Sequence, residues 1–288
     1  MIAEKYLNQL QRESPDFTRL YAEMQAQQGL DKTLHIAVCG LMNAGKSALL
    51  NALTGHLQEE FFETKAVRAT KVVQALTHQG ITYVDTPGID VNNEDEEQAW
   101  RGLANADIIL FAHNLRTGTL EAAEVEFLKA LKRRRPDIES CMLVVLTHSE
   151  SATDQREARL EAIAGILAPL FQTPRILVPT SFSSYRKGVL EQKPALINHS
   201  GINDLHKHLK TWIERHPVDI GAVRRARYQQ RKIELVAIVD AVVAKREREL
   251  ATIESKQSQA FKILRGSIQQ LAETVRGRIV RCESSDTN

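Results

Sequence analysis

The sequence predicts an α/β fold with a mainly parallel sheet, and three observations lead to that prediction. Residues 34–39 form a short apolar run, and residues 40–47 after it fit the phosphate-binding pattern G-x-x-x-x-G-K-[ST] without a mismatch. Residues 47–53 then carry the apolar spacing of a helix that stops before Gly55. Residues 141–146 are apolar throughout, which is typical of a strand buried on both faces of a parallel sheet. The strand, the glycine-rich loop and the helix together predict a nucleotide site.

The loop at residues 40–47 contains the residue types that phosphate binding needs. Its two glycines let the backbone curl, so that successive N–H groups point inward at an anion. Lys46 adds a positive charge between the outer phosphates, and the Ser47 hydroxyl is placed to ligate magnesium. The predicted nucleotide-binding residues of this segment are Asn43, Ala44, Gly45, Lys46, Ser47 and Ala48.

A second motif, Asp85-Thr86-Pro87-Gly88, follows an apolar strand at residues 81–84. A carboxylate at a strand end can hold magnesium through water, and a backbone N–H at Gly88 can contact a terminal phosphate and sense its loss. The motif lies about forty residues after the phosphate loop. We therefore interpret Asp85 and Gly88 as functional residues rather than as an ordinary turn.

Composition is that of an ordinary globular protein: of 288 residues, 43% are hydrophobic and 26% charged, and the formal net charge is +2. That charge gives no global reason to expect nucleic acid as a partner. The cysteines Cys39, Cys141 and Cys282 have no metal-ligand spacing, so we expect reduced thiols in a cytoplasmic protein. The charged amino terminus does not fit a signal peptide, and no stretch reaches ~18 uninterrupted apolar residues. We expect a soluble protein that can still touch a membrane surface.

Three segments of different character predict the domain organisation: a helical arm at 1–30, a nucleotide-binding domain at 31–216, and a long helix or helical hairpin at 217–288. The arm should break at Ser14-Pro15. In the last segment apolar residues recur mostly at three- and four-residue steps, Gly266-Ser267 is a candidate bend, and the final residues from Cys282 on should be frayed. The apolar stripe of such a helix needs cover, which the arm can supply in a helical bundle or coiled coil.

Residues outside the motifs receive structural interpretations. Arg133-Arg134-Arg135 ends a predicted helix at 120–131, where it complements the helix dipole. Trp100 is interpreted as a packing residue, and the basic cluster from Arg224 to Lys232 as a solvated helix face, with an anionic membrane or RNA as the alternative. The remaining predicted elements are a mobile loop at 59–70, strands at 71–77, 107–112 and 175–179, an acidic and then helical stretch at 92–100, and helices at 154–170 and 201–214.

On residues 40–47, a candidate switch threonine and Asp85-Thr86-Pro87-Gly88, the chain resembles the P-loop GTPases of the Era-like and dynamin-like branches over residues 33–215. The resemblance implies a Ras-like GTPase core that hydrolyses GTP to GDP and phosphate with Mg²⁺. It makes Thr70 the candidate for the switch threonine that closes over magnesium, with Thr64 as the runner-up. The residues then expected to be catalytic are Lys46, Thr70, Asp85 and Gly88, and those expected at magnesium are Ser47, Thr70 and Asp85.

The same resemblance places a guanine-reading motif at Thr147-His148-Ser149-Glu150, directly after the strand at 141–146. The usual lysine is replaced by His148 and the usual aspartate by Glu150, whose carboxylate extends one methylene further. Ser181 is the candidate in the serine-containing loop beside the base. Two alternatives stay open: the base is held elsewhere, or the protein is an ATPase.

The family's usual glutamine is absent, because Ile89 follows Gly88 and cannot orient a water molecule. Isoleucine also stands there in Era-like and dynamin-like GTPases, which use other loops, a partner subunit or a monovalent cation. In potassium-activated members an asparagine at the place of Asn43 helps to bind K⁺, a fixed charge in place of an arginine finger. We expect slow turnover that potassium, self-association or both increase.

Two classes of output follow from the resemblance. The first is a dynamin-like GTPase that forms a nucleotide-dependent homodimer through its GTPase domain and reaches a membrane surface or a protein partner through its carboxyl-terminal helix. The alternative is an Era-like regulatory switch that binds a protein or ribonucleoprotein partner. Helical segments at both ends favour the first, and the short tail favours the second.

Overall fold

The computed structural model describes residues 4–28, 33–63, 73–88, 100–215 and 220–285. Its contacts divide the chain into two compact units. One unit, here the helical unit, combines Met1–Tyr21 with Gln229–Asn288, and the other, the nucleotide unit, is Ala22–Tyr228. The predicted domain boundaries at 30/31 and 216/217 describe functional parts of the chain, which these two units do not test, so they stay a prediction.

The nucleotide unit is built on a six-stranded sheet in the order β2-β3-β1-β4-β5-β6. Strand β2 is antiparallel to β3, and every other neighbouring pair is parallel, which confirms the predicted fold class. The strands are β1 (Leu34–Cys39), β2 (Gln74–His78), β3 (Ile81–Asp85), β4 (Ile108–Asn114), β5 (Met142–Thr147) and β6 (Leu177–Pro179).

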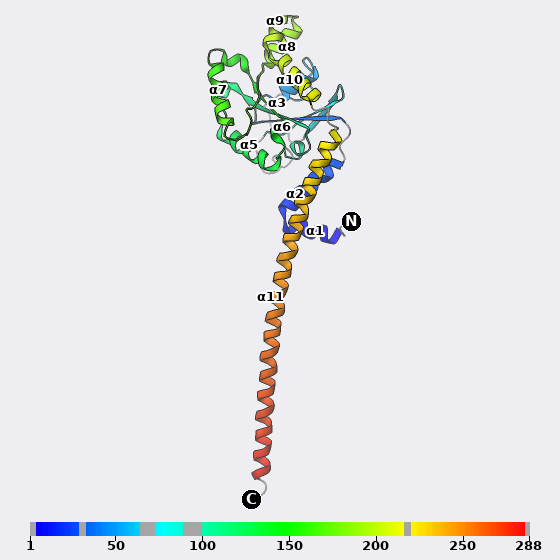
Figure 1. Cartoon of the computed structure of the whole chain (residues 1–288), viewed down its shortest axis with the longest axis vertical. Coiled ribbons are helices and arrows are strands. Elements are labelled where there is room, and N and C mark those ends of the chain that lie inside the picture. Colours follow the sequence, from blue (N-terminus) through cyan, green and yellow to red (C-terminus); the bar gives the residue numbers. More distant parts are fainter. Residues whose placement is uncertain (1–3, 29–32, 64–72, 89–99, 216–219, 286–288) are drawn as a thin grey trace. The chain divides into compact units, whose positions relative to one another are not determined.

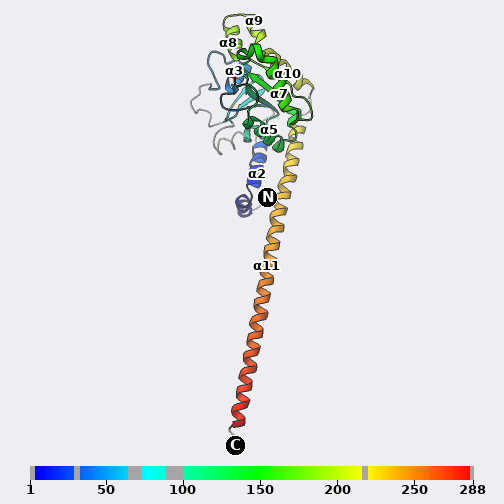
Figure 2. The ribbon, with the colours of Figure 1, turned by 90° about the vertical axis from the view of Figure 1, so that its left-hand side faces the viewer.

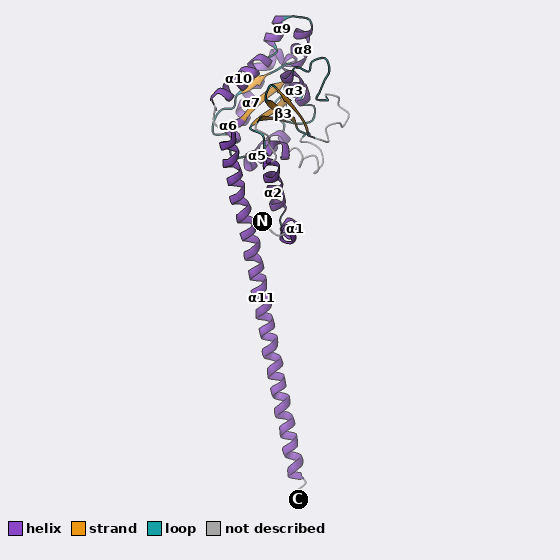
Figure 3. Cartoon of the chain, turned by 90° about the vertical axis from the view of Figure 1, so that its right-hand side faces the viewer, coloured by secondary structure: helices purple, strands orange, loops and turns teal. Residues whose placement is uncertain are grey.

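Helices cover both faces of this sheet, as Figure 3 shows by secondary structure. On one face α5 (Ala122–Arg134) and α7 (Arg156–Leu167) bury Phe127 and Ile163 against alternate strand residues such as Phe111. On the other face α3 (Lys46–Thr54) and α10 (Ile202–Arg215) pack on the remaining strand residues, which alternate along the strands with those of the first face (Figure 1). The central strands are buried on both faces, which explains why their sequences are apolar throughout.

The elements of this unit follow the predictions closely, with additions near the carboxyl end. Gln79 and Gly80 form the turn between β2 and β3, and both have positive φ, of 49° and 77°. Three short helices were not predicted: α6 (Ile138–Cys141), α8 (Phe182–Leu190) and α9 (Pro194–His199). Short 3₁₀ helices lie at Leu115–Thr117 and Ser149–Gln155. The serine-containing loop predicted around Ser181 is short, because Ser181 caps α8 and the helix begins at Phe182.

The basic cluster at the start of the last helix is not wholly a solvated face: that interpretation was wrong for three of its residues, Arg224, Arg227 and Arg231, the last of which is 5% exposed. Arg224 pairs with Asp107, with Nη2 2.6 Å from Oδ2 and Nε 3.2 Å from Oδ1. Arg227 pairs with Asp137 at 3.0 Å. The guanidinium groups of both arginines are nearly buried inside the nucleotide unit. They stabilise its fold rather than meeting a membrane or RNA.

Arg135 likewise does more than complement a helix dipole. It is 2% exposed, and its Nη1 donates to the carbonyl oxygens of Leu103, Ala104 and Ala106. Its other side forms a two-point ion pair with Asp137, at 2.8 and 2.9 Å. Arg135 therefore ties the end of α5 to the segment that precedes β4.

Two smaller predictions for this unit hold. Trp100 is buried and stacks on Phe127, with Arg134 4.0 Å from its ring centre, so it is a packing residue. Cys39 and Cys141 are free and buried, and burial raises the pKa of their thiols to about 12 and about 11. Both thiols are therefore protonated and inert at neutral pH.

The helical unit draws on α1 (Glu4–Glu13), on the first part of α2 (Pro15–Gln28) and on most of α11 (Ile220–Ser285). The predicted break at Ser14 is confirmed: the Ser14 hydroxyl accepts a hydrogen bond from the Phe17 N–H at 3.1 Å and caps α2. Within this unit Arg246 forms an ion pair with Glu13, which joins α11 to α1.

Helix α11 is one continuous helix of 66 residues, drawn unbroken in Figure 2. Of the two predicted alternatives, the long helix is confirmed, and the helical hairpin with a bend at Gly266-Ser267 was wrong, because an isolated glycine lowers helix stability by only about 1 kcal/mol. The predicted fraying was wrong for residues 282–285, which continue the helix, and residues 286–288 lie outside the described residues.

The second half of α11 presents an exposed apolar stripe, which consists of Phe261, Leu264, Ile268, Leu271 and Val275. These residues follow three- and four-residue steps, as the sequence predicts. Among the helices that the structure describes, none contains a segment apolar and long enough to span a bilayer.

Candidate functional site

The predicted site residues gather at one edge of the sheet. Strands β1, β3, β4, β5 and β6 all run in the same direction, so their carboxyl ends lie together. Ligand sites of open α/β sheets lie at this edge. The phosphate loop follows β1, the Asp85 motif closes β3, and residues from Thr147 onward follow β5.

The phosphate loop has the backbone that its glycines were predicted to allow. Gly40 has a φ of 150° and Gly45 a φ of 78°, and Gly45 precedes α3 directly. A Cβ at Gly40 would lie 2.2 Å from the carbonyl oxygen of Ala112, so only glycine fits there. Asn43 also adopts the left-handed region, with a φ of 60°. The loop thus delivers the amino-terminal end of α3 to the phosphate site.

Lys46 extends along the loop instead of into solvent. Its Nζ donates to the carbonyl oxygens of Leu41 at 2.8 Å and Gly40 at 3.1 Å, and the residue is only 9% exposed. The ammonium group therefore lies within the cradle that the loop forms, where a phosphate would meet it.

Ser47 and Asp85 form the corner that was predicted to hold magnesium. The Ser47 hydroxyl donates to Asp85 Oδ2 at 2.7 Å. Asp85 is 1% exposed, and its other oxygen, Oδ1, has no hydrogen-bond partner among the described residues. Burial raises the pKa of Asp85, against the opposing effects of the Ser47 hydrogen bond and the Lys46 charge.

This pair of residues fits a magnesium ion. A buried carboxylate oxygen without a partner is costly, and a cation relieves that cost. The donors are a carboxylate and a hydroxyl, which are the hard oxygen ligands that Mg²⁺ prefers. Ser47 and Asp85 are therefore the residues that would hold the ion.

The rest of the Asp85 motif is held against the phosphate loop. The Thr86 hydroxyl donates to the carbonyl oxygen of Val38 at 2.8 Å. A Cβ at Gly88 would lie 3.3 Å from the backbone of Met42, so Gly88 passes close to the loop. The candidates Thr70 and Thr64 and the residue Ile89 lie outside the described residues.

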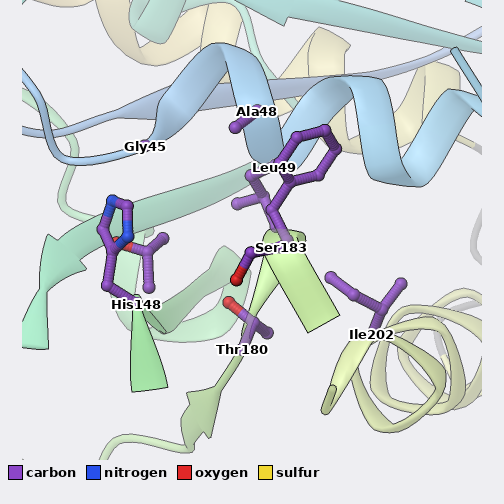
Figure 4. Close-up of a pocket in the computed structure, with 9 residues that line it drawn as sticks. Gly45, Ala48, Leu49, His148, Thr180, Ser183 and Ile202 are labelled. Carbon is purple, nitrogen blue, oxygen red and sulfur yellow. The ribbon is translucent and has the colours of Figure 1, made fainter. Parts of the chain in front are cut away.

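A cavity opens beside the phosphate loop, and Figure 4 shows the side chains around it. Most of its wall is apolar, and polar atoms enter from the ends of β5 and β6. This is the place where a base attached to phosphates in the loop would lie, because Gly45 and Ala48 belong to both surfaces. The lining residues are Gly45, Ala48, Leu49, Thr147, His148, Thr180, Phe182, Ser183 and Ile202.

Thr147 lines this cavity, but its hydroxyl is used by the phosphate loop. Oγ1 lies 2.8 Å from the carbonyl oxygen of Ala44, to which it donates, and 3.2 Å from that of His113. The residue therefore joins β5 to the loop and sets the distance between the phosphate and base subsites.

Glu150 lies next to two residues that line the cavity, His148 and Ser183. His148 is in the left-handed region, with a φ of 55°, and its Nδ1 is 3.8 Å from Glu150 Oε1. Burial and the charge of Arg116 lower the pKa of His148, so the imidazole is neutral at pH 7. Burial would raise the pKa of Glu150, but hydrogen bonds from Ser181 and Ser183 outweigh it and lower that pKa.

Three interactions around the site escaped the sequence analysis. Ser183 donates to Glu150 Oε1 at 3.0 Å. Asn114, at the end of β4, donates from Nδ2 to the backbone oxygen of Asn43 at 3.2 Å. His113 and Glu124 form a buried pair at 2.9 Å behind the loop. Ser183 was within reach of prediction, because Ser181 is a good helix cap and places Ser183 on a first turn; the other two interactions join distant parts of the sequence.

Comparison with known proteins supports the interpretation of this sheet edge as a nucleotide site. A family model described as the 50S ribosome-binding GTPase matches residues 35–148, which include the phosphate loop and the Asp85 motif. The chain carries a P-loop GTPase domain. The match ends at His148, so it does not reach Glu150 or Ser181.

Relatives of this GTPase domain include longer proteins. An uncharacterized protein of Acinetobacter baylyi is 31% identical over 211 residues, which are 72% of this chain and 48% of that protein. The tRNA modification GTPase MnmE of Verminephrobacter eiseniae is 32% identical over 124 residues, 39% of this chain and 25% of that protein. The chain thus spans about half the length of the first relative and about a quarter of the second.

A solved structure resembles most of the chain, including the helices outside the GTPase domain. It is an oligomerised bacterial dynamin pair, described as a mechanism for long-range sensing and tethering of membranes. The match has a TM-score of 0.51 at 18% identity and covers 93% of this chain and 50% of that chain. At this identity the likeness concerns the fold alone.

Proposed function

We propose that the GTPase domain binds GTP and GDP with Mg²⁺, hydrolyses GTP to GDP and phosphate, and couples the bound nucleotide to the helices at both ends of the chain. One observation carries the proposal: Asp85 accepts the Ser47 hydroxyl at Oδ2, and its Oδ1 has no hydrogen-bond partner among the residues that the structure describes, at the sheet edge that also holds the phosphate loop. The functional parts we propose are the arm at 1–30, the GTPase domain at 31–216 and the helix at 217–288.

The residues of the loop have separate roles in this reaction. The oxygen of a water molecule forms a bond to the terminal phosphorus of GTP, while the bond between that phosphorus and the bridging oxygen breaks. The electron pair of the broken bond stays with GDP, and the water proton leaves with the phosphate. Mg²⁺, when bound, supplies charge neutralisation to the phosphates. Lys46 stabilises the negative charge on the terminal oxygens, and the backbone N–H of Gly88 binds the terminal phosphate.

Base recognition is proposed for Glu150. Guanine presents two neighbouring N–H groups on one edge, and a carboxylate accepts both, whereas adenine presents an acceptor there. His148 is placed to pack on the base, and Ser181 borders the same subsite. The ATPase alternative predicts no preference for guanine.

Isothermal titration of GDP, GTP and ADP into the magnesium-loaded protein tests the proposal. We expect GDP to bind at least a hundredfold more tightly than ADP, and Glu150→Ala to remove that preference, because a lost charged hydrogen-bond pair costs about 3 kcal/mol. Glu161→Ala, an exposed carboxylate on α7, is the matched control and should leave both affinities unchanged. Equal affinity for GDP and ADP in the unaltered protein would reject the GTPase assignment while leaving the phosphate loop as a nucleotide site.

For catalysis we propose that a potassium ion at Asn43 supplies a fixed positive charge beside the phosphates. Asn43 is exposed at the mouth of the loop, and Asn114 holds its backbone. Phosphate release from GTP should then be faster in potassium than in sodium at matched ionic strength. Identical rates in the two salts would remove the cation from the mechanism and leave self-association as the source of activation.

For the output we propose a dynamin-like GTPase, peripheral at a membrane, that dimerises through its GTPase domain in the GTP state. The exposed apolar stripe of α11 favours this over an Era-like switch, because it offers a surface for a membrane or protein partner. Co-sedimentation with anionic liposomes, with GDP or a non-hydrolysable GTP analogue, should show binding that depends on nucleotide. Absence of binding in both states would favour the Era-like alternative.

A further inference from the structure

The base subsite contains a side-chain pair that spans two strand ends. Glu150 lies in the 3₁₀ turn after β5, and Ser183 lies in the first turn of α8, after β6. The Ser183 hydroxyl donates to Glu150 Oε1 at 3.0 Å, and the Ser181 hydroxyl is 3.2 Å from that of Ser183. Ser181 itself is fixed, because it accepts the N–H of Ser184 as the cap of α8. Ser183, at the start of α8, thus holds the carboxylate of Glu150 in the turn after β5.

A glutamate needs such support more than an aspartate does. Its extra methylene adds one rotatable bond, and fixing that bond costs several tenths of a kcal/mol or more. The carboxylate is also about one-third exposed, so packing alone does not hold it. A carboxylate has about four lone-pair sites, so it can accept Ser183 and still accept two N–H groups of a base. The hydrogen bond from Ser183 therefore fixes the direction of the carboxylate without using up its capacity.

We propose that Ser183 is a positioning residue for base recognition, and that Glu150 and Ser183 form a matched pair that sets guanine selectivity in this GTPase domain. The inference rests on the proposed function, because it concerns how the same site reads its base. It adds Ser183 to the base subsite, and it explains why residue 150 is a glutamate: that side chain is long enough to reach the Ser183 hydroxyl on α8. An aspartate at position 150 would withdraw from both Ser183 and the base.

The nucleotide that reports on this pair is inosine diphosphate, which lacks the 2-amino group of guanine. A well-directed carboxylate gains one hydrogen bond from that amino group, so GDP should bind more tightly than IDP. A misdirected carboxylate loses this advantage. A purely structural effect of a substitution would instead weaken GDP, IDP and ADP by the same factor.

The test is isothermal titration of GDP, IDP and ADP into full-length variants loaded with magnesium. We expect Ser183→Ala to weaken GDP about 5- to 10-fold and to shrink the GDP-to-IDP affinity ratio, with ADP unchanged, because it removes one hydrogen bond to a charged group. Ser183→Thr keeps the hydroxyl and should restore both values. Glu150→Asp should weaken GDP by a similar factor despite its conserved charge.

Two further variants decide between the pair and a local structural effect. Ser184→Ala changes the neighbouring serine, whose hydroxyl makes no hydrogen bond to any residue that the structure describes, and should behave like the unaltered protein. In the background of Glu150→Ala, Ser183→Ala should have no additional effect, because Ser183 acts through Glu150. Ser183 is exposed, so alanine is compatible with folding.

The outcomes separate this inference from the proposed function. If the unaltered protein prefers GDP over ADP and Glu150→Ala removes that preference, the proposed function stands. An unchanged GDP-to-IDP ratio in Ser183→Ala, or tighter GDP binding by Glu150→Asp, would then overturn the pairing alone. If the unaltered protein has no preference for GDP, the proposed function fails first, and the pairing fails with it.

Discussion

At the scale of single residues, the buried pair of His113 and Glu124 carries a charge into the core behind the phosphate loop. His113 Nδ1 lies 2.9 Å from a Glu124 oxygen, and its Nε2 lies 3.1 Å from the carbonyl oxygen of Gly118. Both neighbours accept hydrogen bonds, so both ring nitrogens donate and the imidazole is protonated. Burial alone would lower the pKa of His113, but the hydrogen bond and charge of Glu124 outweigh it and raise that pKa above the ordinary 6.5.

The stability that this pair adds should depend on pH. A raised pKa in the folded state means that the contribution is complete below the ordinary value and is lost as the pH rises through the folded value. We expect His113→Gln to lower the free energy of unfolding by about 3 kcal/mol at pH 5.5, and by less at pH 9, since it leaves a buried carboxylate without its charged partner. Urea unfolding at both pH values measures the difference.

The control for this prediction is His199→Gln, which changes an exposed histidine. Its effect on the free energy of unfolding should be small and equal at the two pH values. A His113→Gln effect that does not change with pH would show that the imidazole acts as a neutral packing group.

Residues that act through local chemistry could be predicted from the sequence, and those that act through distant partners could not. Lys46, Ser47, Asp85 and Gly88 lie where the two motifs place them, because each motif fixes its own geometry. Glu150 could be proposed because the family resemblance places a guanine-reading motif at the end of β5, which Thr147 closes. Asn114 and His113 were missed, since their partners are ten or more residues away and only the fold brings them together.

At the scale of elements, Gly201 holds the start of α10 against the end of β6. Its φ is 71°, and a Cβ there would lie 1.9 Å from the carbonyl oxygen of Pro179. The N–H of Ser181 donates to the carbonyl oxygen of Ser200 at 2.8 Å in the same junction. This junction places Ile202 in the wall of the base cavity.

Gly201→Ala and Gly55→Ala form a matched pair that isolates this close approach. Both glycines have a φ in the seventies, so alanine carries the same backbone strain of about 1–2 kcal/mol at either place. Nothing lies within 4 Å of a Cβ at Gly55, whereas Gly201 would clash with backbone. We expect Gly201→Ala to cost about 2 kcal/mol more in urea unfolding. Equal costs would mean that the junction yields easily.

Among the elements, the regular ones were predictable and the short ones were not. The strands and α3, α5, α7 and α10 carry clear periodicity, so residue spacing alone located them. Helices α6, α8 and α9 have four to nine residues, too few for a periodic pattern to stand out. Helix α11 was predicted as either one long helix or a hairpin, and the sequence did not decide between them, because an isolated glycine such as Gly266 is tolerated within a helix.

At the scale of the whole molecule, the first two turns of α11 belong to the nucleotide unit. Arg224 and Arg227 pair there with Asp107 and Asp137, so this unit needs residues up to 228 to be complete. We expect a fragment of residues 22–228 to unfold in one cooperative transition and to bind GDP as the full chain does.

A shorter fragment, residues 22–219, is the matched comparison. It removes both arginines, so Asp107 loses its ion pair with Arg224, whereas Asp137 keeps its pair with Arg135. A broken buried pair costs about 3–5 kcal/mol at most, so the melting temperature of this fragment should fall steeply. Thermal unfolding followed by circular dichroism measures the difference. Similar melting temperatures for the two fragments would show that the two arginines do not stabilise the nucleotide unit.

The division of the chain also sets the order in which its parts can form during synthesis. The helical unit needs Met1–Tyr21 together with Gln229–Asn288, which are separated by about 200 residues. At about 5–20 residues per second, the first segment waits roughly 10–40 s for its partner to be translated. A ten-residue helix such as α1 is not stable alone over that time. The GTPase domain can therefore fold and take up nucleotide on the ribosome before the two ends of the chain meet.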